Sequence, residues 1–157
     1  MNNEKYNKLI EKISLDKIEL NSLNCAQNEN FNEKGNLDIV LNHDIINTIV
    51  HGVELSTLIS FKILAVNNNE IEIENNKSLN KDSILFKIEF ILNLEYSLQI
   101  ESEEDFLVDY KKEIETFVEN NVPFNAWPYA REIVSSITTR MGFPALIMPT
   151  YKLIPKY

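Results

Sequence analysis

The sequence predicts an α+β fold, in which a four-stranded antiparallel sheet is covered on its apolar face by a long C-terminal helix. Two observations carry this prediction. In residues 84–100 every even position is apolar and most odd positions are polar, as in a strand with one buried face. In residues 130–141 apolar side chains recur at helical spacing instead. Because an antiparallel sheet with one apolar face needs a cover, this helix is expected to pack on the sheet.

The composition limits the class of protein. A chain of 157 residues is long enough to bury one hydrophobic core, so a single domain over residues 1–157 is expected. The formal net charge of −9 argues against nucleic-acid binding, which needs clustered Lys and Arg. No apolar run approaches the roughly 20 residues of a membrane-spanning helix, and the charged N-terminus is unlike a signal peptide. The chain is therefore expected to act in the cytoplasm, without membrane insertion.

The N-terminal part is expected to add a short helix to the sheet. Asn3 can cap this helix, and its apolar face consists of Tyr6, Leu9, Ile10 and Ile13. In residues 13–25 the apolar positions switch from odd to even, which predicts a strand with a bulge. Residues 28–36 are polar and predict a loop, and residues 37–41 alternate, which predicts a short second strand.

Residues 53–65 alternate over a longer stretch and predict a third strand. Asparagines in residues 67–80 then predict a turn, after which residues 84–100 form the fourth strand. His43 and His51 lie in a polar stretch before the third strand and are predicted to be surface or loop residues without a metal. With only three glycines in the chain, a phosphate-binding loop is not expected, so no cofactor is predicted.

A helix is expected between the fourth strand and the C-terminal helix. Ser102 and the acids that follow it form a capping-box-like start, and Asn120 and Asn121 are expected to end the helix. Its apolar face consists of Phe106, Leu107, Tyr110, Ile114, Phe117 and Val118.

The C-terminal helix is expected to be separate and to begin near Pro128, with Asn125 capping its free N–H groups. Gly142 and Pro144 are expected to end it. The sequence that follows, FPALIMP, is apolar without helical or alternating spacing. It is therefore predicted to cross the molecule as an extended apolar segment.

The C-terminal helix and its exit resemble the SecB family of protein-export chaperones. The matching residues are Pro128, Tyr129, Ala130, Arg131 and Glu132 at the helix start, and Phe143, Pro144 and Leu146 at its exit. The resemblance implies a SecB-like, ATP-independent holding chaperone that binds unfolded polypeptides, such as preproteins for export and translocation, in apolar grooves. It also implies a homotetramer built as a dimer of dimers, with the translocase ATPase SecA as a further partner.

Seven residues are predicted to contact clients: Phe124, Trp127, Phe143, Leu146, Ile147, Met148 and Tyr151. Few local residues exist to cover them, and an apolar groove can accept many unfolded sequences by repacking. For any single one, a place in the core or in a subunit interface is an equal alternative. The oligomer interface is predicted at Ile133, Ile137 and Met141 or on the opposite face of the helix, with a dimer as the alternative to the tetramer. Arg131 and Glu132 are interpreted as structural, because charges at a helix start usually form local ion pairs.

The chain departs from the family pattern in several places. The N-terminal helix and the helix before residue 121 are additions. The lid helix that follows the extended segment in the export chaperone is expected to be missing here, which predicts a more open groove. Glu89 corresponds to one of the acids with which the family contacts SecA, and it is predicted to bind that partner.

Other functions remain open alternatives. Some family members chaperone the antitoxin of a toxin–antitoxin pair, and the sequence does not exclude this role. A non-chaperone adaptor, which binds one folded partner through the same apolar segment, is the alternative from another class. No residue pattern points to catalysis, so the chain is not expected to be an enzyme. Cys25 is interpreted as a half-buried residue without chemistry.

Overall fold

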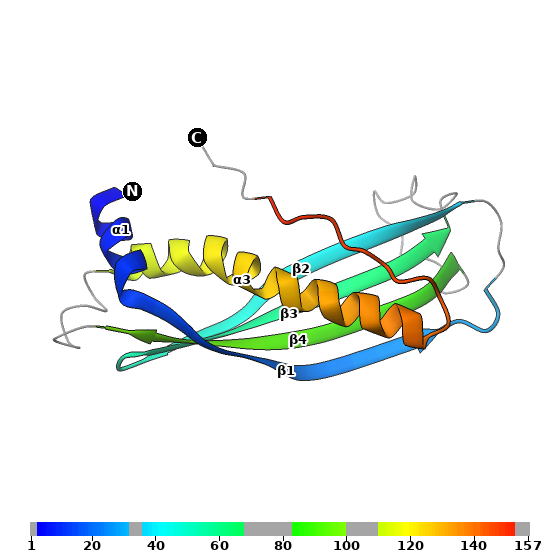
Figure 1. Ribbon diagram of the computed structural model, residues 1–157, viewed down its shortest axis with the longest axis horizontal. Coiled ribbons are helices and arrows are strands. Elements are labelled where there is room, and N and C mark those ends of the chain that lie inside the picture. The colour runs from blue at the N-terminus through cyan, green and yellow to red at the C-terminus, as the bar shows by residue number, and fades with distance from the viewer. Residues whose placement is uncertain (1–2, 32–35, 68–82, 100–109, 153–157) are drawn as a thin grey trace.

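The structure, a computed structural model, describes residues 3–31, 36–67, 83–99 and 110–152. Its strands are β1 (Ile13–Gln27), β2 (Leu37–His51), β3 (Glu54–Asn67) and β4 (Ile84–Leu98), and its helices are α1 (Asn3–Lys12) and α3 (Lys111–Arg140). The strands form one antiparallel sheet in the order β1-β4-β3-β2. Figure 1 shows α3 lying lengthwise over one face of this sheet, with α1 at one end. The predicted α+β architecture, a four-stranded antiparallel sheet under a long C-terminal helix, is confirmed.

The core lies between the sheet and α3. Alternate residues of β3 and β4 are buried, as their sequence pattern predicts. Phe61 of β3 and Phe90 of β4 are paired across the sheet with ring centroids 5.0 Å apart. Tyr96 of β4 packs edge-on against Phe117 of α3 at 5.1 Å. Burial of these large apolar rings therefore stabilises the contact between the two layers.

β1 contains the predicted bulge. Its pairing with β4 shifts register between Leu15 and Lys17, and again between Leu20 and Ser22. Each shift inserts a residue without a partner, so the following apolar residue returns to the face that α3 covers. This explains why the apolar positions switch from odd to even along the strand. Cys25, which was predicted to be half buried, is exposed.

The second strand begins at Leu37 as predicted, but β2 continues to His51, so its predicted end at Leu41 is wrong. The polar residues that follow Leu41 pair with β3 in register, for example Asn42 with Lys62 and Thr48 with Thr57. Pairing with the long strand β3 thus determines their conformation, which local sequence preference does not reveal. Gly52, with φ 59°, lies in the turn that joins the two strands.

α3 runs unbroken from Lys111 to Arg140, so the prediction of two separate helices is wrong. Pro123 and Pro128 lie inside α3, where each lacks the N–H that would bond to the carbonyl four residues earlier. Next to these prolines, Val122 and Ala126 are fully buried in the core. Burial of this helix face offsets the cost of about 3 kcal/mol for an interior proline. Residues 102–109, where the first helix was expected to start, lie outside the described residues.

The asparagines that were expected to end one helix and cap the next lie within α3. Asn121 accepts a hydrogen bond from the hydroxyl of Tyr6 in α1 at 2.8 Å. Asn125 donates one to the hydroxyl of Tyr96 in β4 at 3.1 Å. Burial raises the pKa of Tyr96 to about 12, and the hydrogen bond from Asn125 acts in the opposite direction. Because distant tyrosines bond to these amides, the amides do not compete with the helix backbone.

The C-terminal end of α3 agrees with the prediction. Met141 follows the last helical residue, and Gly142 has φ 89°, in the left-handed region that favours glycine. The N–H groups of Gly142 and Phe143 donate to the carbonyls of Thr139 and Thr138 at 3.1 and 3.0 Å. These bonds satisfy helix-terminal carbonyls where the chain turns back.

α1 confirms the predicted N-terminal helix. Leu9 is fully buried in the core, Tyr6 is half buried against it, and Ile10 is 36% exposed. Together with the bond from Tyr6 to Asn121, Leu9 fixes α1 against α3.

Candidate functional site: two grooves along the long helix

The crossover segment, residues 142–152, leaves the C-terminal end of α3 and runs back along it (Figure 1). As predicted, it forms neither helix nor strand. Two side chains of α3 bond to its backbone. The N–H of Leu146 donates to the hydroxyl of Thr138 at 3.0 Å, and the indole N–H of Trp127 donates to the carbonyl of Pro149 at 2.7 Å. These bonds hold the segment antiparallel to the helix.

The side chains of the crossover segment differ sharply in burial. Met148 is 2% exposed and lies in the core, whereas the neighbouring Ile147 is 71% exposed. Phe143 packs on Phe86 of β4 with ring centroids 5.2 Å apart, and Leu146 is half buried against the same core. Among the predicted client contacts, Ile147 is therefore accessible, and Met148 is covered by its own chain.

Trp127 lies in an aromatic cluster that joins α3, the crossover segment and the sheet. The ring centroid of Trp127 lies 5.0 Å from that of Tyr151, 5.7 Å from that of His43 and 6.0 Å from that of Phe61. The prediction of His43 as a surface or loop residue is wrong, because β2 extends past this residue and turns its side chain toward the core face. Burial lowers the pKa of His43, with Asp44 acting in the opposite direction, and burial raises the pKa of Tyr151.

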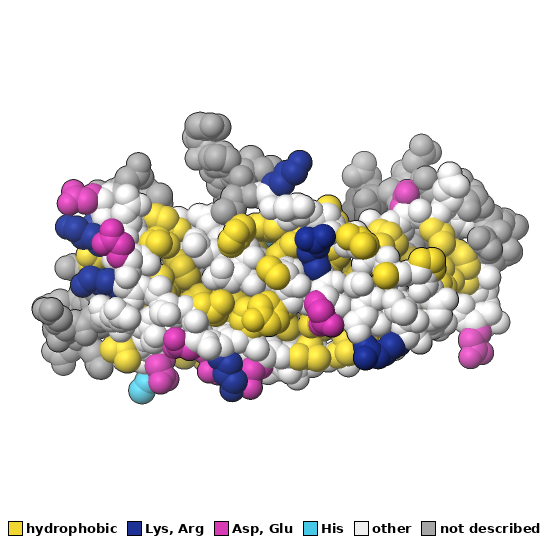
Figure 2. Space-filling view, viewed as in Figure 1, with side chains coloured by type: hydrophobic (Ala, Val, Ile, Leu, Met, Phe, Trp, Pro, Cys, Tyr) yellow, Lys and Arg dark blue, Asp and Glu magenta, His cyan; other side chains and the backbone are white. Residues whose placement is uncertain are grey.

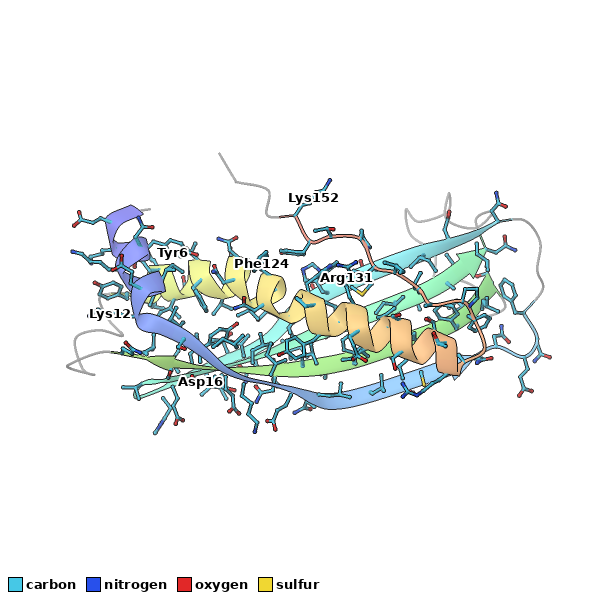
Figure 3. All side chains as sticks on the ribbon, viewed as in Figure 1. Tyr6, Lys12, Asp16, Phe124, Arg131 and Lys152 are labelled. Atoms are coloured by element: carbon cyan, nitrogen blue, oxygen red, sulfur yellow. The ribbon has the colours of Figure 1, made fainter. Side chains whose placement is uncertain are left out.

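An open groove of ≈ 260 Å³ lies beside this cluster, and we call it the crossover groove. Its lining residues are Phe124, Asn125, Trp127, Pro128, Arg131, Thr150 and Tyr151. Three of the predicted client contacts, Phe124, Trp127 and Tyr151, are thus brought together. Phe124 is 52% exposed, whereas Trp127 is 7% exposed. Figure 3 shows Arg131 between α3 and the crossover segment, so a cation borders this largely apolar groove.

A second groove of ≈ 380 Å³ lies between α3 and the edge strand β2, and we call it the β2 groove. It is lined by Thr48, Val50, Lys111, Ile114, Glu115 and Val118. Sequence reasoning missed this groove, because it ended the second strand at Leu41. The alternation of Thr48 and Val50 within a β-branched stretch is the signal that could have revealed it.

The residues predicted at the oligomer interface, Ile133, Ile137 and Met141, are half buried against the core. Beside them, β1 carries a row of apolar residues on its helix-facing side, which we call the β1 strip: Leu15, Ile18, Leu20 and Leu23. Leu15, Leu20 and Leu23 are 40%, 49% and 39% exposed. Figure 2 shows apolar side chains gathered along α3 and toward β1 on this face. A single chain therefore leaves the β1 strip open to solvent.

Glu89 lies on the other face of the sheet. Its carboxylate forms ion pairs with Lys87 at 2.8 Å and with Lys62 at 3.9 Å. These lysines place positive charge beside the acid that was predicted to contact SecA.

No protein-family model matches the chain, and no curated protein matches it. Among solved structures, it is similar to the Mycobacterium tuberculosis Rv1957 SecB-like chaperone in complex with a ChAD peptide from the Rv1956 HigA1 antitoxin. The match covers 97% of this chain and 99% of that chain, with a TM-score of 0.75 and 14% sequence identity. The fold is therefore SecB-like. The resemblance predicted from the sequence is confirmed at the level of the fold.

A protein of unknown function from Streptococcus agalactiae also matches, with 14% identity and a TM-score of 0.36 over 88% of this chain and 97% of that chain. This value is too low to carry an argument.

In the SecB-like fold of the present chain, both grooves follow the side of α3 that faces β2 and the crossover segment. Neither of the two described helices is long and apolar enough to cross a membrane.

Proposed function

We propose that the protein is an ATP-independent holding chaperone that binds unfolded polypeptides along α3. The crossover groove carries this proposal, because it combines the exposed Phe124 with the aromatic pair Trp127 and Tyr151. An unfolded client offers short apolar and aromatic segments, and an apolar groove can accept different segments by repacking. Holding of this kind uses binding energy alone, so neither catalysis nor a nucleotide is part of the proposal.

Five of the seven predicted client contacts divide into direct and supporting residues in this proposal. Phe124, Ile147 and Tyr151 are direct contacts, because a client can reach their exposed or half-exposed side chains. Met148 and Trp127 support the groove, since both are nearly buried and hold the crossover segment on α3. A client would thus bind beside the crossover segment, which stays in place.

Two classes of client are compatible with this groove. Preproteins for export follow from the family resemblance, with delivery to SecA as the next step. An antitoxin segment is favoured by a separate observation, since the structurally similar Rv1957 was solved with an antitoxin peptide. Lys62 and Lys87 pair with Glu89 and offset its negative charge. This part of the sheet should therefore bind SecA, which contacts acidic residues of the family, more weakly. We therefore favour an antitoxin over a preprotein.

The proposal includes self-association in the cytoplasm. The β1 strip exposes several large apolar side chains in a row, and such a surface is usually covered in an assembly. Ile133 and Ile137 of α3 lie half buried on the core side of this region and would extend the contact. A dimer through the β1 strip, doubled to a homotetramer, would bury it and leave the β2 edge of each subunit free.

The test is suppression of aggregation of several unrelated unfolded proteins, at stoichiometric amounts and without nucleotide. The wild type should suppress aggregation, and the double variant Phe124→Ser with Ile147→Ser should lose most of this activity. The matched control is Ile10→Ser with Val53→Ser, which changes two exposed apolar residues outside both grooves and should retain it. If the wild type protected no client, the chaperone proposal would be rejected in favour of the adaptor hypothesis, in which the protein binds one folded partner.

A further inference from the structure

Arg131 of α3 is a cation at the wall of the crossover groove. Its side chain is exposed and lines the groove together with Phe124, Trp127 and Tyr151. Figure 3 places it between α3 and the crossover segment. The other lining residues are apolar or neutral, and none of them is an acid. A positive charge therefore lies beside aromatic surface, and no carboxylate of the same groove neutralises it.

Arg131 has no ion-pair partner in the part of the chain that the structure describes. A local ion pair was expected from the sequence, but Glu132, the next residue, does not line the groove and forms no ion pair with Arg131. By contrast, Lys62 and Lys87 of the sheet both pair with Glu89. The guanidinium of Arg131 is therefore available to donate hydrogen bonds to a carboxylate of another chain.

The charge beside the crossover groove differs in sign from that of the whole chain, which is formally −9. Lys152 follows Tyr151 in the crossover segment, is exposed and forms no ion pair with a described residue. Figure 3 shows it pointing away from α3, so it adds positive potential nearby, whereas Arg131 can touch a bound segment. Charges of the chain farther off than the Debye length of about 8 Å are largely screened. The local cations therefore decide which charge a bound segment prefers.

The spacing of Phe124 and Arg131 specifies the segment that can use both. They are seven residues apart on α3, which is about 10.5 Å along the helix axis. An extended segment rises about 3.3 Å per residue, so about three residues cover this distance. An aromatic side chain packed on the exposed ring of Phe124 would thus bring the side chain about three positions away to Arg131.

We propose that the crossover groove selects client segments in which an acidic residue lies about three positions from an aromatic one, with Arg131 binding the carboxylate. This inference rests on the proposed function and specifies the class of client. The planar guanidinium matches a carboxylate in two parallel hydrogen bonds, and the apolar walls of the groove strengthen the pair by keeping water away.

The test uses fluorescence anisotropy with peptides of about eight residues, blocked at both ends, that contain one phenylalanine among neutral residues. One position, three residues from the phenylalanine on either side in separate series, carries glutamate, glutamine or lysine. In one of the two series the wild type should bind the glutamate peptide at least about threefold more tightly than the glutamine peptide, and the lysine peptide most weakly. About 1 M salt should remove this preference. Glutamate directly beside the phenylalanine should give no gain, because it cannot reach Arg131 from there.

Variants of Arg131 identify the group that reads the charge. Arg131→Gln should abolish the preference for glutamate, and Arg131→Glu should reverse it in favour of the lysine peptide. Arg131→Lys should retain part of it, since the charge remains but the planar fork is lost. The matched control is Lys112→Glu, the same change of charge at an exposed cation of α3 about 28 Å along the helix, and it should keep the preference. Urea unfolding checks that every variant is folded.

Equal affinities of the glutamate and glutamine peptides for the wild type would overturn this inference, while the proposed function would stand because the neutral peptide still binds. A preference for glutamate that survives Arg131→Gln would overturn it as well. If only a free C-terminal carboxylate on the glutamine peptide raised the affinity, Arg131 would bind chain ends and the side-chain proposal would be wrong. Failure of all peptides would also overturn it, and suppression of the aggregation of full-length clients would then decide the proposed function separately.

Discussion

The indole N–H of Trp127 donates a hydrogen bond of 2.7 Å to the carbonyl oxygen of Pro149, which joins the middle of α3 to the crossover segment. The crossover segment has no strand partner among the described residues, so beyond Phe143 this bond and the one between Leu146 and Thr138 join its backbone to α3. Trp127 also packs on Tyr151 at 5.0 Å. The shape of the crossover groove therefore depends on one side chain of the helix.

Trp127→Phe removes this hydrogen bond and keeps an aromatic ring. The free energy of unfolding should fall by about 1 kcal/mol, with a further loss from the smaller ring. Urea unfolding measures this difference. Tyr129→Phe, which changes an exposed ring of the same helix, is the control and should have little effect. If Trp127→Phe were as stable as the wild type, the bond to Pro149 would not be what holds the segment.

Met148 and Ile147 are neighbours in the chain with opposite burial, so the same substitution should act on different properties. Met148→Ala should lower the free energy of unfolding by about 2–5 kcal/mol, because it opens a cavity in the core. Ile147→Ala should change stability by less than about 0.5 kcal/mol but weaken client binding. Urea unfolding and peptide titration measure the two effects. A stable Met148→Ala variant that loses client binding would instead make Met148 a direct contact.

Leu20 lies in the β1 strip and is 49% exposed. Leu20→Asp places a charge where a second subunit is proposed to pack, so the assembly should dissociate while the thermal melt of each chain changes little. Sedimentation velocity measures the mass. Ile46→Asp, an equally exposed isoleucine at the opposite edge, is the control and should assemble as the wild type. A wild type that sediments as a monomer at micromolar concentration would refute this interface.

His43 should make stability depend on pH. Burial holds its folded-state pKa below the ordinary value of about 6.5, so the unfolded chain binds the proton more readily. The free energy of unfolding should therefore decrease as the pH falls through about 6.5, and level off once the folded state is also protonated. Urea unfolding at about pH 7.5 and about pH 5.5 measures the change. His43→Gln should remove this part of the dependence.

The control for the pH experiment is His51→Gln, because His51 is exposed at the end of β2 and makes none of the ring contacts of His43. This variant should retain the pH dependence of the wild type. Identical pH profiles for His43→Gln and the wild type would show that another group is responsible.

Local patterns were sufficient for part of the fold. The even-numbered apolar residues of β4 and the odd-to-even switch in β1 each depend on neighbours a few positions away, and both predictions are confirmed. The same holds for the end of α3 at Gly142, where a single residue must adopt a positive φ. The extended crossover segment also follows from local sequence, since Pro144 and Pro149 exclude regular structure.

Partners distant in sequence decided the rest. Asn121 and Asn125 carry the local signals of a helix end and a helix start, but bonds to Tyr6 and Tyr96 and the burial of the helix face keep α3 continuous. The part of β2 beyond Leu41 is a strand because β3 pairs with it. No window of a few residues contains these contacts, so sequence patterns could not predict them.

The candidate site divides in the same way. The sequence by itself determined that Phe124, Trp127, Ile147, Met148 and Tyr151 form an apolar group near a helix and its exit, because their chemistry and spacing are local. Only the tertiary structure decided that Met148 enters the core while Ile147 faces solvent, and that His43 and the β2 groove lie beside the cluster. The physical reason is that burial depends on which distant surface a side chain meets, and here that surface is the sheet.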